Sequence, residues 1–290
     1  MTTAHPAVRA DAALVLEGGG MRAQYASGAM DCFLKAGISF PYVIGVSAGI
    51  SNAASYVAGQ FERNRQVFTR FAGDPRYFSW RNWVTQGNPF GMDFIYRELP
   101  NYLPFDFAAF AAAPVRFRIG ATDCATGRAV YFDKGEAKLE EALLASSSLP
   151  LVGRMATVNG RLYLDGGIAD PIPFRQAAAD GYGRRVVVLT RNRGFRKPAP
   201  GAGVRAAVRV KYRKFPELGA AVARQHETYN RALDELEAEE AAGRLLVIRP
   251  SRPLAVGRYS QDRAQLEGLY QNGQADAAAG LEKLRDFLSA

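Results

Sequence analysis

The sequence predicts an α/β fold in which helices cover a mostly parallel sheet. Two observations favour this class. In the first half of the chain, short apolar runs alternate with helical patterns. The composition, 48% hydrophobic and 22% charged over 290 residues, is that of an ordinary globular protein, and its aliphatic and aromatic content excludes intrinsic disorder. Such a chain buries a sizeable core as one large domain or two small ones.

The expected elements follow from the local pattern in chain order. The apolar run at 13–16 predicts a strand, which leads through a glycine-rich turn into a helix at 22–35 that Gly37 closes. A second strand and a second helix are expected at 42–46 and 48–58. Patterns of the same kind predict a hairpin about residues 125–127, strands at 116–121, 129–132, 161–164, 186–190 and 245–248, helices at 136–145, 173–179 and 217–242, and two short helices after Gln261.

The composition also limits the function. Two cysteines, Cys32 and Cys124, are too few for a disulfide framework or a zinc site and fit a reducing compartment as small core residues. The two histidines, His5 and His226, disfavour metal sites and catalysis built on several imidazoles. The net charge of +9 favours an anionic partner, either a nucleic acid or an acidic lipid leaflet. Residues 1–12 hold no apolar run for a signal-peptide core, and no run of about 18 apolar residues occurs, so we expect a soluble, cytoplasmic protein.

Ser47 lies in a G-x-S-x-G pattern, Gly45-Val46-Ser47-Ala48-Gly49, where a strand is expected to end and a helix to begin. A nucleophile in such a tight turn needs glycine or very small neighbours, which Ala48 and Gly49 provide. The N-terminus of the following helix favours developing negative charge. The alternative is a serine that caps a helix in a glycine-rich turn.

Gly18, Gly19 and Gly20 follow the first expected strand and precede Arg22. Successive glycines let backbone N–H groups turn toward one point, which suits an oxyanion or a phosphate, and Arg22 adds a fixed positive charge. The Gly-Lys-Ser/Thr sequence that a P-loop requires is absent. A dinucleotide fingerprint, Gly18-x-Gly20-x-x-Ala23, is disfavoured because no acidic residue ends the second strand.

Asp165 follows the apolar run 162–164 and is itself followed by Gly166 and Gly167. An aspartate at the carboxyl end of a strand points into the crevice where open α/β sheets bind ligands, whereas the alternative is an ordinary Asp-Gly-Gly turn. All three motifs follow expected strands, so one sheet edge would gather glycine N–H donors, the hydroxyl of Ser47 and the carboxylate of Asp165. That set is the minimum for acyl transfer: nucleophile, base and oxyanion hole.

The third member of a catalytic triad is harder to find. The order Ser47, Asp165, His226 matches that of α/β-hydrolases, but His226 falls inside an expected helix rather than on a loop after a late strand. His5 lies in the N-terminal tail, and we expect both histidines to be plain surface residues. Asp165 would then take the serine proton itself. Its reference pKa of about 3.9 is low for that task, and partial desolvation would raise this pKa toward the working pH.

At these positions the chain resembles the bacterial patatin-like phospholipases. The resemblance spans roughly residues 13 to 190 and rests on four motifs in order, namely Glu-Gly-Gly-Gly-Met-Arg at 17–22, the G-x-S-x-G pattern at 45–49, Ala-Ser-Ser-Ser-Leu-Pro at 145–150 and Asp-Gly-Gly at 165–167. It implies a patatin-type three-layer α/β sandwich and a Ser–Asp dyad that hydrolyses acyl esters of lipids, with no cofactor and no metal. By motif, the resemblance implies that Ser47 is the nucleophile and Asp165 is the base. It also implies that Gly18, Gly19 and Gly20 form the oxyanion hole and that Arg22 contacts the substrate.

The expected organisation is a catalytic domain over residues 13–194 and a basic, mainly helical C-terminal extension over residues 195–290 packed on it. The expected partner is a lipid ester, with peripheral contact to the inner face of an anionic membrane. No specific nucleic acid is predicted, because the basic charge is accompanied by no recognised motif. A different class of function stays open, a non-catalytic module that binds anionic lipid or phosphate with the same glycines and Arg22.

Two further patterns each have a structural and a functional interpretation. Eleven of the 32 aromatic residues lie between Tyr77 and Phe110, either as a core patch or as an apolar groove for an acyl chain. Eleven Lys or Arg residues and no Asp or Glu lie in 181–216. Part of this segment, 204–215, predicts a helix that is a solvated basic face, a nucleic-acid patch or an interfacial helix on anionic lipid. Its expected apolar side is Val204, Val208, Tyr212 and Phe215, and its expected cationic side is Arg205, Arg209 and Arg213.

Overall fold

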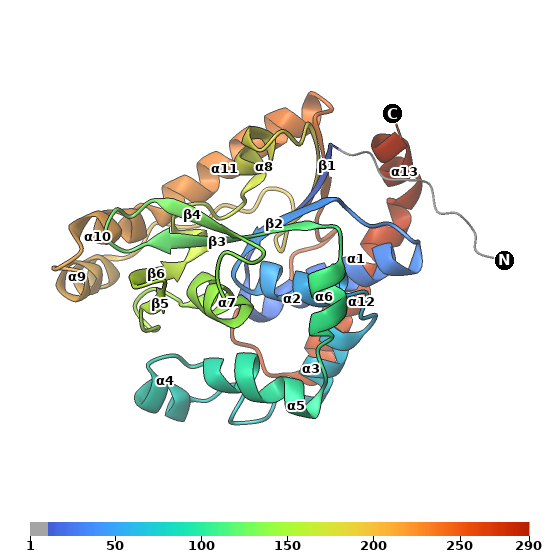
Figure 1. Cartoon of the computed structure of the whole chain (residues 1–290). Helices are drawn as coiled ribbons and strands as arrows, with labels where there is room; N and C mark the ends of the chain where they lie inside the picture. Colours follow the sequence, from blue (N-terminus) through green and yellow to red (C-terminus); the bar gives the residue numbers. More distant parts are fainter. Residues whose placement is uncertain (1–10, 290) are drawn as a thin grey trace.

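The computed structural model describes residues 11–289, which contain one sheet of eight strands with helices on both of its faces (Figure 1). The strands are β1 (Ala12–Leu16), β2 (Tyr42–Val46), β3 (Arg116–Asp123), β4 (Ala129–Asp133), β5 (Ala156–Val158), β6 (Arg161–Asp165), β7 (Arg184–Val188) and β8 (Leu245–Ile248). Their order is β5-β6-β3-β2-β1-β7-β8, and β4 pairs with β3 outside this path. The neighbouring strands β3, β2, β1, β7 and β8 are parallel to one another, so the predicted α/β fold with a mostly parallel sheet is confirmed.

Within the described residues, the α-helices are α1 (Gln24–Lys35), α2 (Ser47–Val57), α3 (Arg63–Phe71), α4 (Trp80–Gln86), α5 (Leu99–Tyr102), α6 (Phe107–Ala112), α7 (Leu139–Ser147), α8 (Phe174–Ala179), α9 (Ala202–Lys211), α10 (Pro216–Ala223), α11 (Gln225–Ala241), α12 (Arg263–Ala279) and α13 (Leu281–Ser289). Two 3₁₀ turns, η1 (Gly20–Ala23) and η3 (Gly166–Ile168), and a π-helical turn, η2 (Phe94–Glu98), complete the regular structure of this part of the chain.

Both faces of the parallel part of the sheet are buried, which explains why its strands are nearly uninterrupted apolar runs. In β1, the side chains of Leu14 and Leu16 enter the larger core, and those of Ala13 and Val15 enter the opposite one. Helices α1, α2, α3, α7 and α12 pack on the first face, and α8 and α11 pack on the second. The chain therefore forms three layers, helix, sheet and helix.

The strands β2 and β6 both pair with β3, and their carboxyl ends meet there. The strand β2 pairs in parallel with the first part of β3, and β6 pairs antiparallel with its last part, while β4 occupies the opposite edge. Val46, the last residue of β2, pairs with Gly120, and Asp165, the last residue of β6, pairs with Ala121. The carboxyl ends of β2 and β6 therefore meet beside two consecutive residues of β3.

Several local features differ from the expected elements, and the four helices α3 to α6, between α2 and β3, were not predicted. The strand β5 was not predicted, because its three residues are too few to show a pattern. The helix expected at 217–242 is two helices, α10 and α11, which Arg224 separates with a φ of −93° and a ψ of 5°. The first of the two short helices expected after Gln261 is α12, which has 17 residues.

Helix α12 belongs to the main core rather than to a small helical appendix. It crosses α1 at two glycines: a Cβ on Gly28 would lie 2.0 Å from the carbonyl oxygen of Tyr270, and a Cβ on Gly273 would lie 2.0 Å from that of Tyr25. Glycine is therefore required at both positions, since any side chain would push the two backbones apart. Leu266 of α12 is completely buried in the core that covers the sheet.

Helix α9 forms within the segment expected at 204–215, but its apolar side faces the protein. Val208 and Tyr212 are buried in a small core with Leu164, and the hydroxyl of Tyr212 accepts a hydrogen bond of 2.8 Å from the N–H of Leu151. Val208 and Tyr212 are therefore not free to enter a membrane, whereas Val204 of the same expected side is 46% exposed. Among residues 11–289, no helix is long and apolar enough to cross a bilayer.

Candidate active site

Ser47 occupies the sharp turn between β2 and α2. Its φ of 55° lies in the left-handed region, a conformation that costs a non-glycine residue about 1–3 kcal/mol and is concentrated at functional sites. The turn packs tightly on the first strand, because a Cβ on Gly49 would lie 2.3 Å from the carbonyl oxygen of Glu17. Helix α2 begins at Ser47, so the hydroxyl lies where the helix dipole favours negative charge.

The hydroxyl of Ser47 donates a hydrogen bond of 2.7 Å to Oδ2 of Asp165. Oδ1 of the same carboxylate accepts the N–H of Gly167 at 2.8 Å, so both oxygens are held. Burial raises the pKa of Asp165 above its ordinary range, although these two hydrogen bonds and the charges of Arg258 and Lys197 act in the opposite direction. A carboxylate with a raised pKa accepts a proton more readily near neutral pH.

Ser146 fixes the backbone of the turn that carries the nucleophile. Its Oγ accepts the N–H of Ser47 at 2.8 Å and donates to the carbonyl oxygen of Gly120 at 2.6 Å. Nearby, the carbonyl oxygen of Ser148 accepts the N–H of Asp165 at 2.8 Å. These serines had no predicted role, and the signal that marked them was the run of three serines at 146–148, which begins inside α7.

The glycine turn presents backbone N–H groups without acceptors beside Ser47. Among the described residues, no acceptor lies within hydrogen-bond distance of the N–H of Gly18, Gly19 or Gly20. A Cβ on Gly18 would lie 2.9 Å from the Cβ of Ser47. Gly20 has a φ of 59°, and a Cβ there would lie 2.7 Å from the carbonyl oxygen of Arg258. Unpaired backbone donors on a turn that packs against Ser47 are suited to bind an oxyanion.

A cavity of about 280 Å³, the cationic cavity, opens at Ser47. All the site residues expected from the sequence line it, namely Gly18, Gly19, Gly20, Arg22, Ser47 and Asp165. Three cations that the sequence analysis did not place here, Arg191, Lys197 and Arg258, line it as well. Burial, together with the charges of neighbouring arginines, lowers the pKa of Arg22 to about 10 and that of Lys197 to about 8.

A second cavity, of about 80 Å³, shares Gly20, Ser47 and Leu149 with the first, so the two meet at Ser47. We call it the apolar cavity, since its other walls include Met21, Tyr77, Phe90, Met92, Ile95 and Tyr96. A further cavity of about 100 Å³ shares Tyr77, Ile95 and Tyr96 with it and extends the apolar space. The aromatic residues between Tyr77 and Phe110 include both core residues and cavity-lining residues. Phe78, Phe94 and Phe110 belong to the core, and Tyr77, Phe90 and Tyr96 line cavities.

His226 is not brought to Ser47. It lies in the first turn of α11, where its Nε2 is 3.8 Å from a carboxylate oxygen of Glu227, and it makes no hydrogen bond with Ser47 or Asp165 in the described part of the chain. Its side chain is 19% exposed, so it is partly buried rather than a plain surface residue. His5 lies outside the described residues.

Comparison with known proteins identifies the family. Residues 14–178, more than half of the chain, match the family model described as patatin-like phospholipase. The chain belongs to the patatin-like phospholipase family. The matched segment contains the glycine turn, Ser47 and Asp165. Residues 215–289 match a second model, a domain of unknown function named DUF6363.

The similar proteins are uncharacterized or distant. The chain is 30% identical over 183 residues to the uncharacterized protein YjjU of Escherichia coli K12, which covers 61% of this chain and 51% of that one. It is 39% identical over 70 residues to the uncharacterized NTE family protein Mb1092c of Mycobacterium bovis, covering 24% of this chain and 19% of the relative. The chain thus spans about half the length of YjjU. Among solved structures, VipD from Legionella pneumophila superposes with a TM-score of 0.45 at 11% identity, covering 93% of this chain and 66% of VipD.

Proposed function

We propose that this protein is a serine acyl hydrolase that cleaves lipid acyl esters through a Ser47–Asp165 dyad and an acyl-enzyme. The observation that carries the proposal is the 2.7 Å hydrogen bond from the Ser47 hydroxyl to the Asp165 carboxylate, at the point where the cationic and apolar cavities meet. An ester bound with its carbonyl at Ser47 would place its acyl chain in the apolar cavity and its alcohol in the cationic cavity.

In the proposed mechanism, Asp165 takes the proton of the Ser47 hydroxyl as the oxygen attacks the ester carbonyl. The backbone N–H groups of Gly18, Gly19 and Gly20 stabilise the oxyanion, an effect worth about 10²–10³ in rate for one well-placed donor. Asp165 then gives the proton to the departing alcohol. Water attacks the acyl-enzyme with Asp165 again as the base, which releases the fatty acid and restores the hydroxyl.

The environment of Asp165 supports its use as the base without an imidazole. Burial raises its pKa toward the working range, and Gly167 fixes one oxygen so that the other faces Ser47. The start of α2 at Ser47 adds a positive dipole end beside the reacting oxygen.

Hydrolysis of p-nitrophenyl butyrate tests the proposal. Ser47→Ala should lower kcat by about a thousandfold or more, because the nucleophile is lost. His226→Ala serves as the control and should leave kcat nearly unchanged. A large loss of kcat in the His226 variant, with stability preserved, would replace the dyad by a triad.

A second candidate function is a non-catalytic module that binds anionic lipid or phosphate. The unpaired cations of the cationic cavity favour it, since they suit an anion whether or not Ser47 reacts. A folded protein that binds phosphate but hydrolyses neither butyrate nor longer acyl esters would support this second function against the first.

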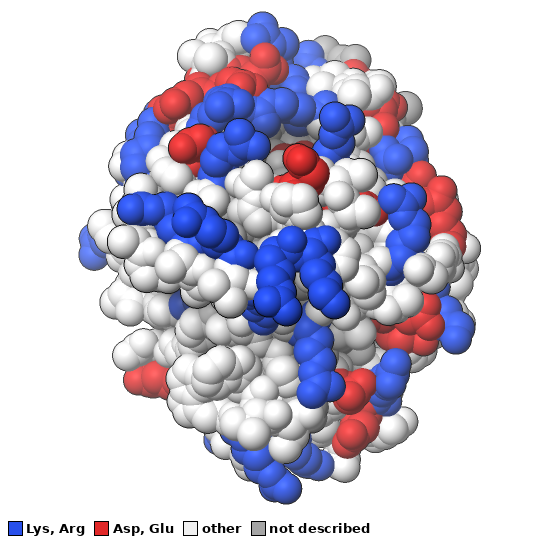
Figure 2. All heavy atoms as spheres, turned by 90° about the vertical axis from the view of Figure 1, so that its left-hand side faces the viewer, with Lys and Arg blue, Asp and Glu red and all other residues white. Residues whose placement is uncertain are grey.

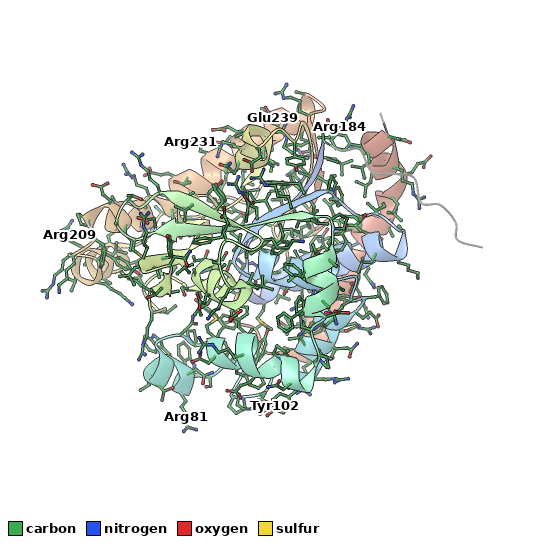
Figure 3. All side chains as sticks on the ribbon, viewed as in Figure 1. Arg81, Tyr102, Arg184, Arg209, Arg231 and Glu239 are labelled. Carbon is green, nitrogen blue, oxygen red and sulfur yellow. The ribbon has the colours of Figure 1, made fainter. Side chains whose placement is uncertain are left out.

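We also propose that the protein docks from the cytoplasm on the inner, anionic leaflet of the membrane. Lys and Arg side chains gather on the face that carries α9 (Figure 2), and Arg209 projects from α9 away from the body of the protein (Figure 3). Helix α4, on the same left-hand side of Figure 1, exposes 65% of Trp80 and 80% of Val84. Because Val208 and Tyr212 are buried, the attraction would come mainly from the charges of α9, at about 1 kcal/mol for each cation near the surface, with α4 supplying the apolar contact.

Co-sedimentation with anionic vesicles tests this docking. Binding should be salt-sensitive, and replacing Arg205, Arg209 and Arg213 by Glu should weaken it at least about tenfold. Replacing Arg70, Lys283 and Arg285 by Glu changes the net charge equally on other helices and is the matched control. Equal binding by the two triple variants would rule out α9 as the docking surface.

The division into a catalytic domain over 13–194 and a basic helical extension over 195–290 is likewise a proposal. The extension supplies β8 to the shared sheet and lines the cationic cavity with Arg258. Removal of residues 195–290 should therefore give a protein that does not fold, and a stable, active fragment 13–194 would contradict this dependence.

A further inference from the structure

The cationic cavity gathers positive charge from three separate parts of the chain. Arg22 belongs to η1, Arg191 and Lys197 follow β7, and Arg258 precedes α12. Arg22 is 7% exposed, and the other three are partly buried. Such a cluster repels itself unless something of opposite charge lies between its members.

The two carboxylates of the same cavity offset only part of the charge of its four cations, since they act on Arg22 and Lys197 through space. Glu17 accepts the N–H of Thr190 at 2.6 Å and the hydroxyl of Tyr229 at 2.7 Å. Asp165 is held by Ser47 and the backbone, as described above. Among residues 11–289, neither carboxylate forms an ion pair with a cation of the cavity.

The absence of partners is most marked at Arg22. Its Nε is buried and has no hydrogen-bond partner in the described part of the chain. The Nε of the buried Arg185 has no partner either, but its Nη2 lies 2.9 Å from a carboxylate oxygen of Glu239, whereas Arg22 forms no ion pair among residues 11–289. Since a buried cation without a partner is strongly destabilising, its presence at the wall of a cavity indicates that a ligand supplies the anion.

We propose that the cationic cavity binds a phosphate group on the alcohol half of the substrate, and that the preferred substrates are acyl esters of phosphorylated alcohols without an ammonium group. This inference rests on the proposed function of Ser47. Arginine side chains offer paired N–H donors that match phosphate oxygens. An ammonium group on the same alcohol would lie among Arg191, Lys197 and Arg258 and would be repelled.

The position of the cluster explains how it would select a substrate. The apolar cavity and the cationic cavity share Ser47, so an acyl chain in the first leaves the alcohol in the second. The phosphate would then hold the ester at the nucleophile from one end while the acyl chain holds it from the other. Binding energy from the non-reacting parts of the substrate would thus orient the reacting carbonyl.

Titration calorimetry on the Ser47→Ala protein tests the proposal without any reaction. The ligands are glycerol 3-phosphate, glycerophosphocholine and inorganic phosphate. Glycerol 3-phosphate should bind at least about tenfold more tightly than glycerophosphocholine, because only the second carries an ammonium group. Lys197→Gln and Arg191→Gln should each weaken binding of glycerol 3-phosphate by about tenfold or more, since each removes a charge-assisted hydrogen bond.

The control variant is Arg70→Gln, which removes an exposed cation of α3 far from the cavity in sequence and should leave the affinity unchanged. Equal affinity for glycerol 3-phosphate and glycerophosphocholine would overturn the proposal. So would binding that neither cavity variant weakens, or binding of inorganic phosphate without binding of glycerol 3-phosphate.

These outcomes are separable from those that test the proposed function. If no ester is hydrolysed but glycerol 3-phosphate binds as expected, the acyl-hydrolase proposal fails and the phosphate site stands. If acyl esters are hydrolysed with the same kcat/KM for lysophosphatidic acid and lysophosphatidylcholine, the hydrolase stands and the phosphate site fails.

Discussion

The two cavities that meet at Ser47 differ in chemistry and in origin. The apolar cavity is lined by residues that all lie within the family match, 14–178. The cationic cavity takes Arg191 and Lys197 from beyond residue 178, and it takes Arg258 from the segment that matches DUF6363. The side that suits an acyl chain thus belongs to the family domain, whereas the side that suits a charged alcohol depends on the region after it.

The largest expected effect comes from replacing Asp165, which contacts Ser47 at the point where the two cavities meet. Asp165→Asn should lower kcat by about a thousandfold or more for acyl esters of every kind, because the amide accepts no proton from Ser47. Assays with one neutral and one phosphorylated ester check this. An equal loss for both is expected, and loss for only one ester would show that Asp165 serves substrate binding rather than proton transfer.

The same variant should keep its fold. An asparagine can still accept from Gly167 and can donate to the oxygen of Ser47, so both contacts survive. The pKa of Asp165 is raised by burial, which means that the folded protein disfavours the ionised form and that stability is lost as the pH rises from the ordinary aspartate pKa through this raised pKa. Asp165→Asn removes that loss, so its melting temperature at pH 7 should equal or exceed that of the natural protein.

A change confined to the apolar cavity should alter chain-length preference alone. Ile95→Trp would fill space in the apolar cavity and in the cavity of about 100 Å³ that extends it, since Ile95 lines both. Excluding about four methylenes, at about 0.8 kcal/mol each, should lower kcat/KM for a dodecanoyl ester by roughly a hundredfold relative to a butyryl ester. The matched control is Val210→Trp on the exposed side of α9. A chain-length profile that is the same in both variants would exclude the apolar cavity as the acyl site.

A smaller effect, confined to the cationic cavity, should appear in its pH dependence. The pKa of Lys197 is lowered to about 8, chiefly by burial and then by Arg258, while Asp165 and Glu17 act to raise it. Between about pH 7 and 9 the lysine therefore loses its charge, and the affinity of the Ser47→Ala protein for sulfate, whose own charge is constant there, should fall several-fold. In Lys197→Arg the fall should be much smaller, because arginine stays charged. If the affinity for sulfate fell equally with pH in both proteins, a group other than Lys197 would be responsible.

The smallest expected effect concerns the strained turn between the cavities. Ser47 has a φ of 55°, so Ser47→Gly should be more stable to unfolding than Ser47→Ala by about 1 kcal/mol. Ser51, in the interior of the same helix, is the matched control. There the order should reverse, with glycine less stable than alanine by about 1 kcal/mol. Denaturant titrations measure both pairs, and a Ser47 pair in the same order as the Ser51 pair would contradict the strain.

The proximity of Ser47 and Asp165 could be predicted from the sequence, but the strand arrangement that produces it could not. The motifs of Ser47 and Asp165 both follow expected strands, and this favoured one shared edge of a parallel sheet. In the structure β6 runs antiparallel to β3, and its end meets the end of β2 on the same edge of β3. Strand direction depends on long-range pairing, which no local pattern contains.

The basic segment 181–216 shows a similar limit. Its eleven cations look alike in the sequence, yet Arg185 is paired with Glu239, Lys197 lines the cationic cavity, and Arg209 projects into solvent. The partners that separate these roles lie tens of residues away along the chain. The sequence therefore indicated the charge of this region but not its division between a cavity wall and an outer face.

The central claim is that Ser47 is a nucleophile activated by Asp165, and labelling with a fluorophosphonate probe followed by peptide mass spectrometry tests it most directly. One phosphonyl adduct on Ser47 is expected, absent from Ser47→Ala, formed far more slowly in Asp165→Asn and formed at the natural rate in His226→Ala. A folded protein that takes no label, or an adduct on another residue, would contradict the claim.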